Sequence, residues 1–202
     1  MLGTKILEEK QSKYNGRLRV VRTLGFGTYI QSGGLTQSGG VVESIWKNTL
    51  NNLPKLNYKN CLILGLGGGT VSKIVFSKFG GIRITGIEID PLMVDLGKKY
   101  LKLEDKNQKI IIEDAFKSVE LKKKYDLVVV DLYNGDNFPE KFESLTFLKK
   151  LLIHKVVVIN RLYYKDKKEK ADIFLEKLKK VFKNIKIHYP PANIMFIISN
   201  YE

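Results

Sequence analysis

The sequence predicts an α/β protein, built on a mainly parallel sheet and preceded by a small β-rich extension. Three observations lead to this prediction. An apolar run at 61–64 passes directly into a glycine-rich turn, and from residue 58 onward strand-like and helix-like segments alternate. The earlier region differs, because six glycines fall within residues 25–40 and predict turns and hairpins. We therefore divide the chain into an extension, residues 1–57, and a main domain, residues 58–202.

The extension is expected to contain two short strands, at 18–24 and 28–31, and one helix, at 41–50. Leu53-Pro54 closes the helix, because the residue before a proline disfavours helical backbone. This region holds too little apolar material for a core of its own. We expect it to dock on the main domain.

The main domain opens with a strand, a glycine turn and a helix. The run at 61–64 suits a strand buried on both faces. The glycines that follow are Gly65, Gly67, Gly68 and Gly69. The next strand, at 82–89, carries Glu88 about 20 residues beyond them, where a carboxylate can accept hydrogen bonds from ribose hydroxyls. Thr70 stands where a dinucleotide fingerprint has its third glycine, so the spacing favours S-adenosylmethionine over NAD.

The remaining elements complete a known architecture. Strands are expected at 61–64, 82–89, 110–112, 127–130 and 156–159, with a terminal hairpin formed by 185–189 and 194–199. One helix begins at Asp90-Pro91, with Leu92, Met93, Leu96 and Tyr100 on its core face, and others are expected at 142–152 and 171–182. Five strands with intervening helices and a final hairpin describe the Rossmann-like class I methyltransferase fold, with its seven-stranded sheet.

Three acids end three successive strands: Glu88, Asp114 and Asp131. Ligands of such sheets bind beyond the carboxyl ends of the strands, so we expect these acids to face one ligand site. Asp114 has an alternative role, because it could simply cap the short helix that follows it.

Composition limits the classes of function. The net charge is +14, but only five of the 35 basic residues are arginine, the residue best suited to bidentate phosphate and base contacts. We interpret the lysines as a solvated surface and expect no specific nucleic-acid partner. The single cysteine excludes an internal disulfide, and the sequence contains neither an apolar run of membrane-spanning length nor a signal-peptide core. We expect a cytoplasmic protein.

Four motifs carry a family resemblance: LILGLGGGT, GIEID, EDAF and YDLVVVDLYNGDNFPE. They resemble the core of the spermidine synthases and their methyltransferase-fold relatives. The segments QSKYNGRLRVV and GGLTQSGG resemble that family's short N-terminal extension. The resemblance implies S-adenosylmethionine, or its decarboxylated form, as the cofactor. It also implies a small-molecule acceptor, no metal and a homodimer.

The resemblance also implies roles for individual residues. Glu88, with Ile89 beside it, would bind the ribose, while Asp114 and the Ala115 backbone N–H would bind the adenine. Gln37 would reach the cofactor from the extension, and the turn glycines would allow its close approach. Asp131 would be the catalytic acid that orients and deprotonates an attacking amine. The residues implied for the acceptor are Trp46, Tyr133, Asn134 and Asp136.

The sequence departs from the family at three positions. Gly68 stands where aminopropyl-transferring members have an aspartate that holds the cofactor's amino group, so its backbone N–H would suit the carboxylate of intact S-adenosylmethionine better. Asn134 replaces a second aspartate of the catalytic loop, and Trp46 replaces a tyrosine. These departures weaken the case for a diamine substrate.

Our interpretation is a transferase that uses S-adenosylmethionine or a close relative to modify an unidentified small molecule. One alternative is a polyamine aminopropyltransferase that uses decarboxylated S-adenosylmethionine and putrescine. The other is a binding or scaffold protein without turnover.

Overall fold

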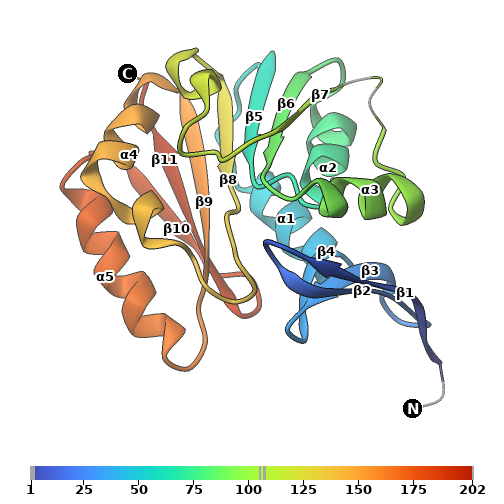
Figure 1. Cartoon of the computed structure of the whole chain (residues 1–202). Helices are drawn as coiled ribbons and strands as arrows, with labels where there is room; N and C mark the ends of the chain where they lie inside the picture. The colour runs from blue at the N-terminus through green and yellow to red at the C-terminus, as the bar shows by residue number, and fades with distance from the viewer. Residues whose placement is uncertain (1–2, 105, 107, 202) are drawn as a thin grey trace.

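The computed structural model describes residues 3–104, 106 and 108–201, which form two sheets and their helices (Figure 1). The extension is a four-stranded antiparallel sheet of β1 (Thr4–Ser12), β2 (Gly16–Thr23), β3 (Gly27–Ser32) and β4 (Leu35–Gly39). The sequence predicts the middle two of these strands but not β1 or β4. β1 lies at the edge of the sheet, and six of its nine residues are exposed and four are charged, so it lacks the alternation of apolar residues that marks a half-buried strand.

The main sheet has seven strands in the order β10-β11-β9-β8-β5-β6-β7. Its parallel strands are β5 (Asn60–Leu64), β6 (Arg83–Glu88), β7 (Gln108–Ile112), β8 (Leu127–Val130) and β9 (Val156–Leu162). The terminal hairpin, β10 (Ile185–His188) and β11 (Asn193–Ser199), joins antiparallel, with β11 against β9. The predicted fold is confirmed.

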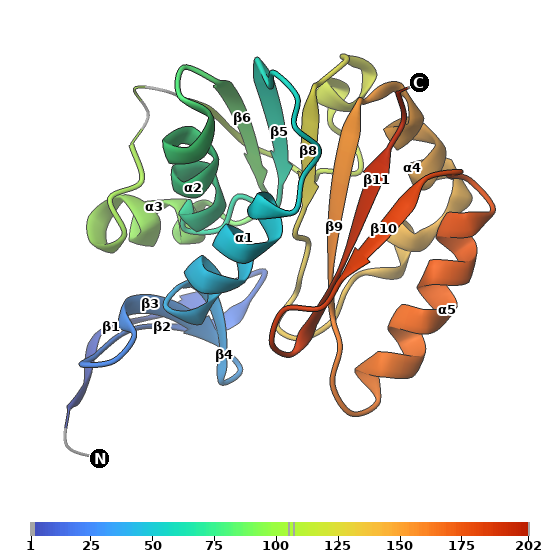
Figure 2. The ribbon, with the colours of Figure 1, turned by 180° about the vertical axis from the view of Figure 1, so that it is seen from behind.

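Helices cover both faces of this sheet (Figure 2). α1 (Val41–Asn51) and α2 (Thr70–Phe79) pack on the face that includes Cys61 and Ile63. α4 (Leu145–Lys150) and α5 (Lys167–Lys179) pack on the face that includes Leu62 and Leu64. Successive residues of β5 thus enter opposite cores, which is why its sequence is apolar throughout.

The helix expected at 142–152 is interrupted. It forms three short pieces, η2 (Glu140–Glu143), α4 and η3 (Leu151–Ile153); a further 3-10 turn, η1 (Val119–Lys122), precedes β8. Ser144 causes the first break, because its backbone is extended and its side chain accepts a hydrogen bond from the N–H of Phe147.

α3 (Pro91–Tyr100) begins as predicted, with the Asp90 carboxylate accepting from the N–H of Leu92 at 3.0 Å. Its apolar face has a different partner from the one predicted, however. Met93 and Leu96 pack against Leu18 and other apolar residues of the extension, in a small core separate from those of the main sheet. The extension therefore depends on α3 for its core, as its low apolar content predicts.

Candidate active site

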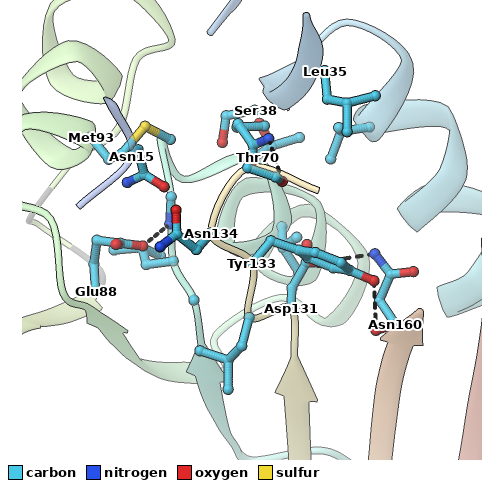
Figure 3. Close-up of a pocket in the computed structure, with 18 of the residues that line it drawn as sticks. Asn15, Leu35, Ser38, Thr70, Glu88, Met93, Asp131, Tyr133, Asn134 and Asn160 are labelled. Atoms are coloured by element: carbon cyan, nitrogen blue, oxygen red, sulfur yellow. Dashed lines mark hydrogen bonds between the residues drawn. The ribbon is translucent and has the colours of Figure 1, made fainter. Parts of the chain in front are cut away.

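A cavity of about 580 Å³ lies at the carboxyl ends of the parallel strands (Figure 3). The main domain supplies one wall from the residues that follow β5, β6, β7 and β8. The extension and α1 supply the other, through the β1–β2 turn, β4 and the first turns of α1. The cavity therefore lies at the edge of the sheet where this fold class binds ligands.

The glycine turn forms the floor of the cavity. Gly65 has a φ of +87°, and a Cβ on it would lie 2.1 Å from the carbonyl oxygen of Asp131, so no side chain fits there. Gly65 and Gly67 line the cavity. Gly67 also donates its N–H to Glu88 Oε2 at 2.7 Å, which ties the turn to the tip of β6.

Gly68 and Gly69 lie outside the cavity lining. The N–H of Gly68 donates to Ser38 Oγ of the extension at 2.8 Å, so it is not free for a ligand carboxylate, contrary to the sequence-based expectation. A Cβ on Gly69 would lie 2.4 Å from Leu103. These two glycines serve close packing of the turn against neighbouring elements rather than an open surface.

Glu88 is buried and lines the cavity (Figure 3). Its Oε2 accepts from Gly67, and its Oε1 accepts from the N–H of Asp90 at 3.0 Å. Burial raises the pKa of this carboxyl, against the lowering effect of these backbone hydrogen bonds. Each carboxylate oxygen accepts more than one hydrogen bond, so both can also receive a hydroxyl. Ile89, next along the chain, lines the cavity as well.

Asp114 lines the cavity, and it also opens a turn rather than the short helix considered from the sequence, since η1 is capped by Ser118. Its Oδ1 accepts from the N–H of Phe116 at 3.0 Å, and its Oδ2 pairs with Lys141 Nζ at 2.6 Å. Burial would raise the pKa of Asp114, but the hydrogen bonds from Lys141 and Phe116 and the charge of Lys141 outweigh it and lower the pKa. Ala115 lines the cavity beside it and is buried.

Asp131 follows β8 and lies between two uncharged donors. Trp46 Nε1 donates to its Oδ2, and Asn160 Nδ2 donates to its Oδ1, each at 2.9 Å. Burial raises the pKa of Asp131, and these two hydrogen bonds oppose the rise only in part. The sequence predicts Asp131 and Trp46 as site residues, but the hydrogen bond between them comes only from the fold.

The loop after β8 is held from two sides, by its own Tyr133 and by Gln37 of the extension. The Tyr133 hydroxyl donates to the carbonyl of Asn160 at 3.2 Å and accepts from the N–H of Leu162 at 2.8 Å, so it braces the loop against β9. Gln37 crosses from the extension and donates to the carbonyl of Gly135 at 3.1 Å. Asn134, between them, lines the cavity.

Asp136 lies outside this cavity. It is exposed and forms an ion pair with Lys167 Nζ at 2.8 Å, beside a second, smaller cavity near α5. The sequence places it in the acceptor site, and the geometry does not bring it there. Its spacing from Asp131 cannot reveal this, because the loop reverses where Asn134 and Asn137 exchange backbone hydrogen bonds.

Asn160 is the site residue that the sequence analysis misses. It lines the cavity, is 7% exposed, and its Oδ1 is buried without a hydrogen-bond partner. The sequence does contain a signal for Asn160. It follows the apolar run 156–159, just as Asp131 follows the run 127–130. The two strands pair in parallel with Val130 opposite Ile159, so the two polar residues lie at the same level. A polar residue at that register belongs to the same sheet edge.

Within the described residues, no group of three His, Cys, Asp or Glu side chains could hold a metal ion. The same part of the chain has no helix that is both long enough and apolar enough to cross a membrane.

A protein-family model and several curated proteins match this chain. A family model described as the spermine/spermidine synthase domain matches residues 42–195. A polyamine aminopropyltransferase from Sulfurisphaera tokodaii is 32% identical over 139 residues, which cover 64% of this chain and 46% of that protein. The chain thus spans about half the length of the curated relatives it matches first.

Solved structures show the same fold at lower sequence identity. A spermidine synthase in complex with the transition state analogue AdoDATO superposes with a TM-score of 0.81 and 19% identity, over 98% of this chain and 74% of that one. Human methyltransferase-like protein 13 in complex with SAH gives 0.62 and 21%, over 80% of each chain.

Proposed function

We propose that this chain, which belongs to the spermine/spermidine synthase family, transfers an aminopropyl group from decarboxylated S-adenosylmethionine to a small-molecule amine. The sequence alone leaves this reaction as an alternative to a broader S-adenosylmethionine-type transferase. The observation that carries the proposal is the position of Asp131, a half-buried carboxylate at the ligand edge of the sheet whose two hydrogen-bond donors are uncharged. Such a group favours a cationic or proton-donating ligand.

The chemistry needs a free amine lone pair. The amine nitrogen attacks the propyl carbon attached to the sulfonium, so a nitrogen–carbon bond forms as the carbon–sulfur bond breaks. The bonding pair passes to sulfur, and 5′-methylthioadenosine leaves. The proton lost from nitrogen passes to Asp131, whose raised pKa makes it a stronger base than an ordinary aspartate. Trp46 and Asn160 hold its two oxygens in place during this transfer.

The other cavity residues suit the nucleoside. Glu88 would receive the two ribose hydroxyls, with Ile89 packing alongside. Asp114 and Ala115 would face the adenine, and Gly65 would let the cofactor approach the backbone. The roles of Gln37 and Gly68 are indirect, because their polar groups already join the extension to the loop and to the glycine turn.

Release of 5′-methylthioadenosine tests the proposal directly. Purified protein is incubated with decarboxylated S-adenosylmethionine and a mixture of primary amines, and the nucleoside product is followed by chromatography. Parallel reactions contain intact S-adenosylmethionine, and calorimetry compares both cofactors with NAD. Amine-dependent release supports aminopropyl transfer. Methyl transfer from the intact cofactor, or tight binding of NAD alone, would contradict it. Binding of the decarboxylated cofactor without turnover would favour the scaffold alternative.

The pH dependence of the reaction gives a second prediction. Replacing Trp46 by phenylalanine removes one of the two hydrogen bonds to the ionised Asp131 carboxylate, so the pKa of Asp131 rises further. Asp131 must be ionised to accept a proton, and so the low-pH limb of kcat moves to higher pH. The shift is about one pH unit for a bond worth ~1.5 kcal/mol.

A rate–pH profile of the Trp46→Phe variant measures this shift. Tyr58→Phe is the matched control, because Tyr58 is also buried and its hydroxyl donates to the Pro54 carbonyl, away from Asp131. An acid limb that stays in place in the Trp46 variant would show that the indole does not tune the base.

Partners beyond the small-molecule acceptor remain predictions. The lysine-rich surface predicts only weak, salt-sensitive binding of nucleic acid. A homodimer and a cytoplasmic location are likewise predictions from the sequence.

A further inference from the structure

We infer that the acceptor is a monoamine whose remaining part is uncharged and largely apolar, rather than a diamine. This inference rests on the proposed aminopropyl transfer and specifies its second substrate. It depends on where the cavity places carboxylates and on what lines the rest of its wall.

The order of the strands divides the cavity into two halves. β6 and β7 lie on one side of β5, and β8, β9 and β11 lie on the other. The acids after β6 and β7 are Glu88, Glu113 and Asp114, and they mark the nucleoside half. We call the part over β8, β9 and β11, with the adjoining wall of α1, the acceptor half. Figure 3 shows the same separation, with Glu88 on one side and Asp131 and Asn160 on the other.

Asp131 is the one carboxylate among the described residues that line the acceptor half. The apolar wall of this half includes Val41, Val42, Leu162, Pro191 and Ala192. Its polar members are uncharged. An extended apolar wall favours a hydrocarbon segment of the acceptor.

The acceptor half offers no second counter-charge among the described residues. Asp131 supplies its one negative charge, and the proposed mechanism assigns that charge to the attacking amine. Asp136, three residues beyond Tyr133, is turned away and paired with Lys167, while Asn134 offers only an amide. The distal ammonium of a diamine would therefore lie against an apolar wall and uncharged polar groups, with no carboxylate to pair with.

The neutral polar groups suit a single amine. Asn160 donates to Asp131 through Nδ2, so its unpartnered Oδ1 lies within the same small cluster. Because that oxygen is itself buried, Asn160 acts on an amine through Asp131, whose carboxylate it holds in place. One amine can therefore give a proton to Asp131, and nothing comparable awaits a second charged end.

Amines of matched length test the inference. We compare butylamine, 4-amino-1-butanol and putrescine, each with decarboxylated S-adenosylmethionine, by release of 5′-methylthioadenosine. We expect kcat/KM for butylamine to exceed that for putrescine at least tenfold, with the amino alcohol between them. Higher kcat/KM for putrescine would overturn this inference while leaving aminopropyl transfer intact. Release with none of the amines would instead overturn the proposed function.

A charge introduced at the loop tests the same point from the protein side. Asn134→Asp adds a carboxylate to the lining of the main cavity, and we expect this counter-charge to raise the putrescine-to-butylamine ratio of kcat/KM at least tenfold. Asn137→Asp is the matched control, because this substitution makes the same charge change in the same loop, while Asn137 lines the second cavity. An unchanged ratio in Asn134→Asp, or an equal change in both variants, would contradict the placement of the acceptor.

Discussion

The Asp131→Asn variant is expected to lose turnover by about a thousandfold, within the range found for removal of a general base. Asparagine keeps the shape of the side chain but cannot accept the proton that the amine must lose. Asp131 lies on the acceptor side of the cavity, apart from Glu88 and Asp114, so affinity for the cofactor should change by no more than about twofold. Single-turnover release of 5′-methylthioadenosine measures the first quantity, and calorimetry measures the second.

The pH dependence of the melting temperature of Asp131→Asn shows whether lost activity comes from the missing base or from a damaged fold. Burial raises the folded-state pKa of Asp131, so the ionised carboxylate destabilises the native state once the pH exceeds the unfolded-state value. Stability from this group is fully present at low pH and is lost as the pH rises through the folded-state pKa. Asparagine never ionises, and a flipped Asn160 amide can still partner it.

We therefore expect the Asp131→Asn variant to melt a few degrees above the parent near pH 8, since about 1 kcal/mol corresponds to 2–4 °C at this size. The difference should vanish near pH 4. Thermal unfolding across this range, followed by circular dichroism, measures it. A variant that melts lower at every pH would indicate that the carboxylate supports the fold.

Replacing Glu88 by alanine is expected to weaken cofactor binding by about 10- to 150-fold, which corresponds to 1.5–3 kcal/mol for charge-assisted hydrogen bonds. The loss has two sources. The ribose hydroxyls lose their acceptors, and the N–H groups of Gly67 and Asp90 lose the carboxylate that orders the turn. Calorimetry with decarboxylated S-adenosylmethionine measures the affinity.

Glu113→Ala is the matched control for this experiment, because Glu113 also ends a strand at the cavity but is not assigned a contact with the cofactor. It should change affinity by less than threefold. If Glu88→Ala unfolds, Glu88→Gln keeps the side-chain volume and should still weaken binding more than the control does. Equal losses in the Glu88 and Glu113 variants would refute a ribose-specific role.

The sequence predicts the central sheet well where strands are buried on both faces. β8 lies at the predicted residues 127–130, and β5 differs from its prediction by one residue, because continuous apolar runs leave few alternatives. The edge strand β1 is not predicted, because its mostly exposed residues do not alternate between apolar and polar. The face of α3 is predicted, but its partner is not, because periodicity shows that a face is buried and not what covers it.

The candidate site divides in a similar way. Acids at the carboxyl ends of strands, such as Glu88 and Asp131, line the cavity because the strand fixes the position at which they leave the sheet. The prediction for Asp136 is wrong because this residue lies in a loop, where the chain reverses and turns the side chain away from the cavity. The pairing of Gly68 with Ser38 spans 30 residues of sequence and depends on how the extension docks, which no local pattern encodes.

The packing around Gly68 also bears on how the preference between the decarboxylated and the intact cofactor could change over evolution. A Cβ on Gly68 would meet the Cδ1 atoms of Ile30 and Leu101 at 2.9 Å, on the side covered by the extension. An aspartate gained there would have to push these two methyl groups aside, and both lie at the far ends of flexible side chains. A smaller residue at position 30 or 101 would give the new side chain room before it appears. The order in which such substitutions arise therefore affects how easily a carboxylate is gained at this turn.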